Sequence, residues 1–159
     1  MSADMQFYFF IKVNPMKIAL VGFGKMGQRI KHILAEKNLE PVAIIDPYSA
    51  GATSKTLDYK SLNGADVVID FSSPAGVMDN IKFYNEVSVN VVMGTTGWYD
   101  RIEDVKRLIG NKTGFIWSGN FSLGVNIFFK IVEEAAAVLS GYKDYDVLMH
   151  EFHHKEKID

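Results

Sequence analysis

The chain has 159 residues, of which 48% are apolar and 23% charged, a composition and length typical of a globular domain with a buried core. Its 17 basic and 19 acidic residues are scattered, so no nucleic-acid groove or basic membrane patch is indicated. Cysteine is absent, which excludes disulfides and thiolate metal sites and fits a reducing cytoplasm. Because no apolar stretch approaches the roughly 20 residues needed to span a bilayer, we expect a soluble, cytoplasmic protein.

The first fifteen residues carry an aromatic and aliphatic run but lack the basic leading region and small-residue cleavage site of a signal peptide. A strongly patterned segment starts at Met16. We therefore interpret residues 1–15 as a non-native leader that is not part of the fold. The alternative is a native edge strand formed by Phe7 to Val13.

From Met16 onward, short apolar runs alternate with amphipathic helical patterns. Ser73 and Pro74 are typical of a helix start, and Gly141 is typical of a helix end. The alternation predicts right-handed crossovers and a Rossmann-type, doubly wound parallel sheet, an α/β fold. The predicted strands lie in 17–24, 41–46, 65–71, 89–94 and 113–118, and the predicted helices in 25–38, from 73 through 84, 100–110 and 125–141.

A GxGxxG pattern leaves the first predicted strand and opens the first helix, the context in which this pattern indicates dinucleotide binding. We expect Gly22 to permit a tight turn, Gly24 to let the backbone approach a pyrophosphate, and Gly27 to let helix and strand pack closely. The N-terminus of the helix would supply amide groups and a partial positive charge. The candidate pyrophosphate residues are Gly22, Phe23, Gly24, Lys25, Met26 and Gly27.

Asp46 ends the second strand, twenty-four residues after Gly22, where a carboxylate can accept hydrogen bonds from the adenosine ribose. The alternative is an acidic strand end that caps its own loop. A 2′-phosphate would be repelled by Asp46 and would need a basic neighbour, which Pro47 and Tyr48 do not supply. Since Lys55 can still reach in from the loop, we favour NADH as the cofactor and leave NADPH open.

Three further strand ends carry polar loops that should converge on the same crevice, because open α/β sheets bind ligands at the carboxyl ends of their strands. The GTTG loop can lie against a nicotinamide ribose, although it can equally be a turn with a threonine cap. The last loop can offer backbone hydrogen bonds to a carboxamide. The candidate residues in these loops are Ser72, Gly94, Thr95, Thr96, Ser118, Gly119, Asn120 and Phe121.

The final segment holds three of the four histidines of the chain within positions 150–154. Without further ligands at fixed distances this is a poor zinc pattern, so we expect no metal site. Histidine and lysine here can neutralise carboxylates and donate a proton, since imidazole titrates near neutral pH. The alternative is a solvated charged tail.

Taken in order, GFGKMG, DFSSP, GTTG, NFSLGVN and EFHHKEKID resemble the bacterial dihydrodipicolinate reductases of lysine and diaminopimelate biosynthesis. The resemblance runs from Met16 to the last residue. It implies NADH- or NADPH-dependent reduction of dihydrodipicolinate (4-hydroxy-tetrahydrodipicolinate), a cyclic dicarboxylate, to tetrahydrodipicolinate. It assigns proton donation to His153 and Lys157, without choosing between them, and substrate binding to His154.

The resemblance also implies a dinucleotide-binding domain over 16–121 and the beginning of an α+β substrate and oligomerisation domain over 122–159. The Pro-Ser-Gly-Thr segment that follows the lysine motif in the family is not in the chain. We therefore expect a fragment that binds dinucleotide with little turnover, and a homotetramer for the full-length protein. The alternatives are a noncatalytic NAD-binding module and another Rossmann dehydrogenase.

Overall fold

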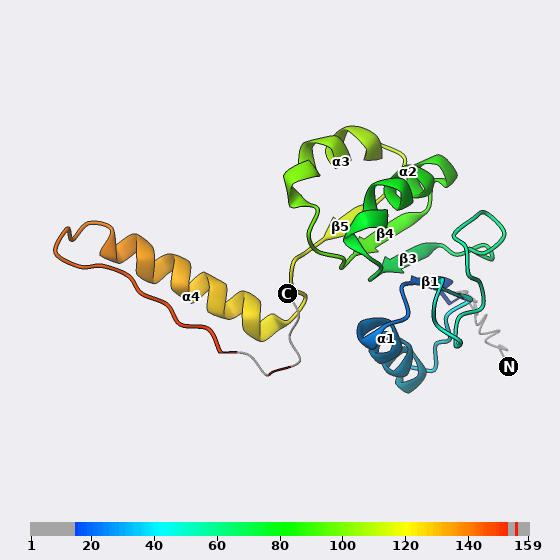
Figure 1. Ribbon diagram of the computed structural model, residues 1–159, viewed down its shortest axis with the longest axis horizontal. Helices are drawn as coiled ribbons and strands as arrows, with labels where there is room; N and C mark the ends of the chain where they lie inside the picture. Colours follow the sequence, from blue (N-terminus) through cyan, green and yellow to red (C-terminus); the bar gives the residue numbers. More distant parts are fainter. Residues whose placement is uncertain (1–14, 153–154, 156–159) are drawn as a thin grey trace, which may run out of the picture. The chain divides into compact units, whose positions relative to one another are not determined.

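The computed structural model describes residues 15–152 and residue 155, and the chain divides into two compact units (Figure 1). The first unit ends at Gly119 and the second begins at Asn120. Residues 1–14, which hold nearly all of the expected leader or edge strand, lie outside the described residues. The assignment of residues 16–121 and 122–159 to a dinucleotide domain and a substrate domain stays a prediction.

The first unit is built on a five-stranded sheet in which every pair of neighbouring strands is parallel. The strand order is β2-β1-β3-β4-β5. The strands are short apolar runs, as expected where helices cover both faces of a parallel sheet. The predicted Rossmann-type sheet is confirmed. The strands are β1 (Ile18–Val21), β2 (Ala43–Ile45), β3 (Val67–Asp70), β4 (Asn90–Met93) and β5 (Phe115–Trp117).

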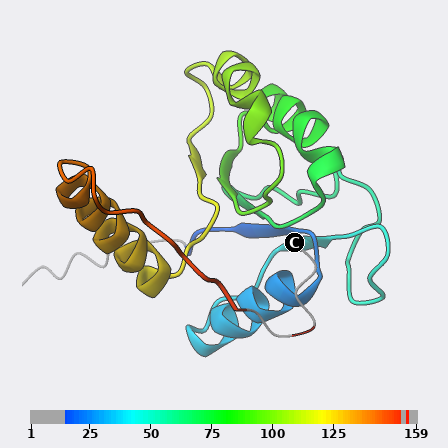
Figure 2. The ribbon, with the colours of Figure 1, turned by 60° about the vertical axis from the view of Figure 1, so that its left-hand side comes forward.

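Helices lie on both faces of this sheet (Figure 2). Helix α1 (Lys25–Glu36) packs on one face through Leu34, in a small apolar cluster with β1 and β2. Helices α2 (Val77–Val87) and α3 (Ile102–Ile109) contact each other on the opposite face. The doubly wound arrangement is therefore confirmed. Single 3₁₀ turns, η1 (Pro74–Gly76) and η2 (Tyr99–Arg101), precede α2 and α3.

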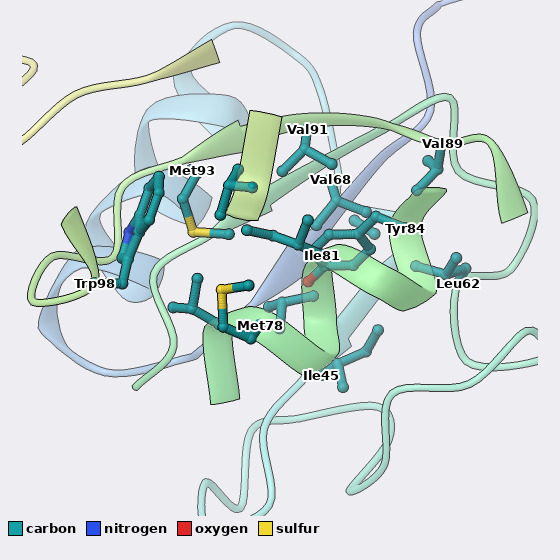
Figure 3. Close-up of a cluster of buried hydrophobic side chains, with 14 of the residues drawn as sticks. Ile45, Leu62, Val68, Met78, Ile81, Tyr84, Val89, Val91, Met93 and Trp98 are labelled. Carbon is teal, nitrogen blue, oxygen red and sulfur yellow. The ribbon is translucent and has the colours of Figure 1, made fainter. Parts of the chain in front are cut away.

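The larger core lies between the sheet and the two helices α2 and α3 (Figure 3). Helix α2 buries the face formed by Val77, Met78, Ile81 and Tyr84, and α3 buries Val105 at its centre. Burying these side chains supplies most of the free energy that holds the helices on the sheet. The labelled core residues in Figure 3 are Ile45, Leu62, Val68, Met78, Ile81, Tyr84, Val89, Val91, Met93 and Trp98.

The helix start at Ser73 is predicted correctly in position, but the expected side-chain cap is wrong. Pro74 occupies the first turn of η1, yet the Ser73 side chain makes no capping hydrogen bond. The physical reason is that the turn is closed by the backbone, because the Gly76 N–H donates to the Ser73 carbonyl at 3.1 Å.

The second unit contains α4 (Leu123–Leu139). Ser122 precedes it, and its hydroxyl accepts a hydrogen bond from the Val125 N–H at 3.5 Å. The helix ends at Leu139, the N–H of the C-cap residue Ser140 donates to the Ala136 carbonyl, and Gly141 follows. Among the described residues, no helix combines the length and apolar content needed to cross a lipid bilayer.

Candidate functional site

The order of the strands opens a crevice above β1 and β3. The chain leaves β1 for β2 on one side and then passes to β3 on the other side, so the segments beyond β1 and β3 diverge. A pocket of about 450 Å³ lies at these carboxyl ends. Residues that line it include Gly22, Gly24, Asp46, Tyr48, Lys55, Leu57, Phe71, Ser72, Ser73 and Asn80.

Two of the three glycines in the turn, Gly22 and Gly27, have a steric reason to be glycine. Gly22 has φ +86°, and a Cβ there would lie 2.2 Å from the Phe71 carbonyl oxygen. A Cβ on Gly27 would lie 2.2 Å from the Gly22 carbonyl oxygen, so α1 starts in direct backbone contact with the turn. A Cβ on Gly24 would meet nothing within 4 Å. The turn therefore leaves open space at Gly24, on the wall of the pocket.

Helix α1 begins beside this open space. Its N-cap is Gly24, and no side chain caps the N-terminus of the helix. The first turn contains no acidic residue that would offset the partial positive charge of the helix end. An anionic group in the pocket would therefore be favoured at this position.

Asp46 holds the glycine turn against the loop that follows β2. One carboxylate oxygen accepts the Phe23 N–H at 2.7 Å, and the other accepts the N–H groups of Tyr48 at 2.8 Å and Ser49 at 2.7 Å. Partial burial acts to raise the pKa of Asp46, but these three N–H groups and the charge of Lys55 outweigh it and lower the pKa. The Asp46 side chain thus caps its own loop, which was the alternative interpretation, and it also lines the pocket.

Lys55 lies on the same side of the pocket. Its ammonium group donates to the Ser49 carbonyl, and its charge is one of the influences that lower the pKa of Asp46. Lys55 is exposed, so it can exchange this carbonyl for an anionic ligand at little cost. The pocket therefore combines a carboxylate and an ammonium group beyond the end of β2.

The GTTG loop after β4 packs behind the pocket. A Cβ on Gly94 would lie 2.1 Å from the ring of Phe71, so the ring rests on the loop backbone. The indole N–H of Trp98 donates to the Thr95 carbonyl at 2.7 Å and closes the loop. Thr95 itself is 5% exposed, and its hydroxyl donates to the Asp70 carboxylate at 3.0 Å. The Thr95 side chain therefore faces the protein interior.

The structure brings only part of the predicted site together. The pocket contains Gly22, Gly24, Asp46 and Ser72, while Lys25 and Met26 are exposed on the first turn of α1. Ser118 follows β5 in the first unit, and its N–H donates to the Met93 carbonyl at 3.4 Å. Beyond Gly119 the predicted residues belong to the second unit or lie outside the described residues. Asn120 and Phe121 belong to the second unit, and His153, His154 and Lys157 are not described.

Sequence reasoning did not propose several residues of the pocket wall, among them Tyr48, Leu57 and Asn80. Asn80 lies on α2, next to the buried positions Val77 and Tyr84 in helical spacing. A polar residue at the edge of an apolar helical face can indicate a pocket wall, and this pattern was present in the sequence at Asn80. Tyr48 and Leu57 come from the loop between β2 and β3, where no periodic pattern indicates which side chains turn inward.

The glycine turn yields a stability prediction. We expect Gly22→Ala to lower the free energy of unfolding by about 2–5 kcal/mol, because the residue has positive φ and its Cβ has no room. Gly24→Ala is the matched control and should cost no more than about 1 kcal/mol. Urea unfolding of both variants measures the difference. Equal stability of the two variants would contradict the proposed steric role of Gly22.

The hydrogen bonds of Asp46 yield a pH dependence. Because its pKa is lower in the folded chain than the ordinary value of 3.8, its stabilising effect is complete above about pH 5 and is lost as the pH falls through the lowered pKa. We expect Asp46→Asn to lower stability by about 1–2 kcal/mol at pH 7, after allowance for solvent screening. The difference from wild type should shrink towards pH 3 in urea unfolding. A difference that stays constant over this range would rule out the carboxylate as its source.

Comparisons with known proteins relate this chain to one family of reductases. The family model described as the N-terminus of dihydrodipicolinate reductase matches residues 16–121. The 4-hydroxy-tetrahydrodipicolinate reductase of Christiangramia forsetii is 36% identical over 147 residues, which cover 91% of this chain and 58% of that protein. The enzyme of the same name from Nitrosomonas europaea is 33% identical, over 92% of this chain and 60% of that protein. The chain thus spans about 60% of the length of these two relatives.

Solved structures of reductases and dehydrogenases resemble this fold. Dipicolinate-bound dihydrodipicolinate reductase from Paenisporosarcina sp. TG-14 matches with a TM-score of 0.63 and 28% identity, over 77% of this chain and 54% of that chain. Aspartate dehydrogenase from Thermotoga maritima matches with a TM-score of 0.53 at 14% identity, over 76% of this chain and 52% of that chain, which is a likeness of fold alone. With the family model covering residues 16–121, the chain belongs to the dihydrodipicolinate reductase family.

Proposed function

We propose that the pocket above β1 and β3 binds NADH or NADPH, and that the full-length protein reduces 4-hydroxy-tetrahydrodipicolinate to tetrahydrodipicolinate. The observation that carries this proposal is the pocket itself. It lies at the switch point of the sheet, between a glycine turn with open space and a strand-end carboxylate, in a chain of the reductase family. A small dicarboxylate substrate is supported by the dipicolinate-bound relative.

The residues of the pocket fit a dinucleotide in two places. The open space at Gly24 and the N-terminus of α1 suit a pyrophosphate, because the backbone can approach and the helix end favours negative charge. Asp46 suits the adenosine ribose, since a carboxylate with three backbone donors still has lone pairs for a hydroxyl. When bound, the dinucleotide would supply the hydride.

NADH is the preferred cofactor in this proposal. The low pKa of Asp46 keeps a negative charge beside the position of a 2′-phosphate, which disfavours NADPH. Lys55 lies on the same wall and offsets part of that repulsion. The balance of these two charges supports a preference for NADH with use of NADPH.

The proton chemistry is assigned to the end of the chain. We propose that His153 or Lys157 donates a proton to the substrate and that His154 binds one of its carboxylates. The support is the resemblance of this segment to the histidine-rich motif of the family, together with the chemistry of its side chains. A cationic acid beside the carbon that gains electron density stabilises the developing charge and supplies the proton.

Calorimetric titration of the chain with NADH and then NADPH tests the binding proposal. We expect a dissociation constant on the order of micromolar for NADH and weaker binding of NADPH. Asp46→Ala should weaken NADH binding about tenfold through lost hydrogen bonds, whereas Lys55→Ala should weaken NADPH binding more than NADH binding. Lys112→Ala is the matched control, since Lys112 does not line the pocket.

Two outcomes would overturn parts of this assignment. Normal NADH binding by Asp46→Ala would mean that Asp46 does not contact the ribose. Tighter binding of NADPH than of NADH would reverse the proposed preference and make Lys55 the dominant charge.

His153→Ala in the full-length enzyme tests the proton assignment. We expect NADH binding to be kept and kcat to fall about a hundredfold, the usual contribution of a general acid. His32→Ala is the matched control, because His32 is exposed on α1, where it pairs with Glu36. A kcat equal to that of the wild type would exclude His153 as the proton donor and leave Lys157.

A further inference from the structure

The end of β3 holds a carboxylate that the proposed reaction does not use. Asp70 is 0% exposed, and every contact of its side chain that the structure shows is a hydrogen bond from a neutral donor. One oxygen accepts the Ser72 N–H at 2.9 Å and the Thr95 hydroxyl at 3.0 Å. The other accepts the Tyr84 phenol at 2.7 Å and the Asn80 amide at 3.1 Å.

These four donors come from three different parts of the site. Ser72 and Asn80 line the pocket, Thr95 belongs to the GTTG loop, and Tyr84 lies on the buried face of α2. The backbone of Asp70 adds to the link, because its carbonyl accepts the Gly94 N–H at 2.8 Å. One buried residue thus contacts the loop after β3, the loop after β4 and the helix between them.

Only an acceptor fits this position. The Ser72 N–H and the Asn80 amide nitrogen can only donate. Burial, together with the charge and hydrogen bond of Asp70, raises the pKa of Tyr84 well above its ordinary value, so the phenol keeps its proton and donates. Among the described residues, no cationic side chain forms a salt bridge with Asp70.

Burying a carboxylate without a cation costs free energy that an apolar side chain would not cost. The position is nevertheless completely satisfied, since none of the described buried side chains lacks a hydrogen-bond partner. What the carboxylate provides beyond core packing is a link between the loop after β3, through the Ser72 N–H, and the GTTG loop, through the Thr95 hydroxyl.

We propose that Asp70 is a positioning residue that holds the loop after β3 and the GTTG loop in fixed relation, so that both halves of one dinucleotide can be bound together. The inference rests on the proposed function, because it assigns the adenosine side to the pocket and the nicotinamide side to Gly94–Thr96. Asp70 does not line the pocket and acts through Ser72, Asn80 and Thr95.

The test compares Asp70→Asn and Tyr84→Phe with Ile81→Val. The amide of Asp70→Asn must turn its NH₂ towards one pair of donors, and Tyr84→Phe removes one donor. Ile81→Val is the matched control, because Ile81 is also buried on α2 and this substitution removes no hydrogen bond. For each variant we would measure the melting temperature, the dissociation constants of NADH and AMP, and amide hydrogen exchange without ligand.

We expect Asp70→Asn to weaken NADH binding about tenfold and Tyr84→Phe about threefold, with a smaller loss for AMP, which occupies one half of the site. Amides in residues 71–73 and 94–97 should exchange faster in both variants but not in Ile81→Val. If Asp70→Asn does not fold, Tyr84→Phe carries the test.

The proposal would be wrong if NADH and AMP lost affinity equally, or if the exchange rates followed the melting temperature in all three variants. Asp70 would then only stabilise the core through its hydrogen bonds. Failure of the wild type to bind NADH would overturn the proposed function instead, and the exchange experiment would still decide whether Asp70 couples the two loops.

Discussion

The close contact of the backbone at Gly22 with the backbone at Phe71 is the constraint on which the site depends. β1 and β3 pair with Val21 opposite Asp70, so the two chains leave the sheet at the same level and touch. A residue with a Cβ has no room at position 22, and the positive φ there turns the chain into α1. Helix α1 then begins against the Gly22 carbonyl through Gly27. The position of the helix N-terminus beside the pocket follows from this one contact.

Two carboxylates extend the constraint to the neighbouring strands. Asp46 accepts the Phe23 N–H and thereby ties the loop after β2 to the glycine turn. Asp70 accepts donors from the segments after β3 and β4 and ties those to each other. The loops of β2, β1, β3 and β4, which are also neighbours in the sheet, are therefore linked in sequence by Asp46, the Gly22–Phe71 contact and Asp70. A pocket held in this way needs little ordering when a ligand binds, which lowers the entropic cost of binding.

Local patterns were enough to predict the fold, the glycine turn and the position of Asp46. Apolar runs and glycine spacing are patterns among residues that are close in sequence, and strands, helices and tight turns depend on such local patterns. The partners of Asp70 were not predictable in the same way. Tyr84 lies on the buried face of α2, and its hydroxyl contacts the carboxylate of Asp70 fourteen positions away, while Thr95 contacts the same carboxylate from twenty-five positions away. Such pairs depend on which strands lie side by side, and residue order alone does not report this.

The same comparison changes how polar residues at strand ends should be interpreted. Asp46, Asp70 and Thr95 all lie at or just beyond the ends of parallel strands, and all are polar where a core residue would be expected. Asp46 lies on the pocket wall, whereas Asp70 and Thr95 are buried and bond to each other. A polar strand end therefore indicates a functional crevice more reliably than it indicates a ligand contact, because some of these side chains shape the loops that make the contacts. The proposed dinucleotide contacts fall mainly in the first unit and the proposed proton donors beyond Asn120, so cofactor binding and proton transfer should respond to different substitutions.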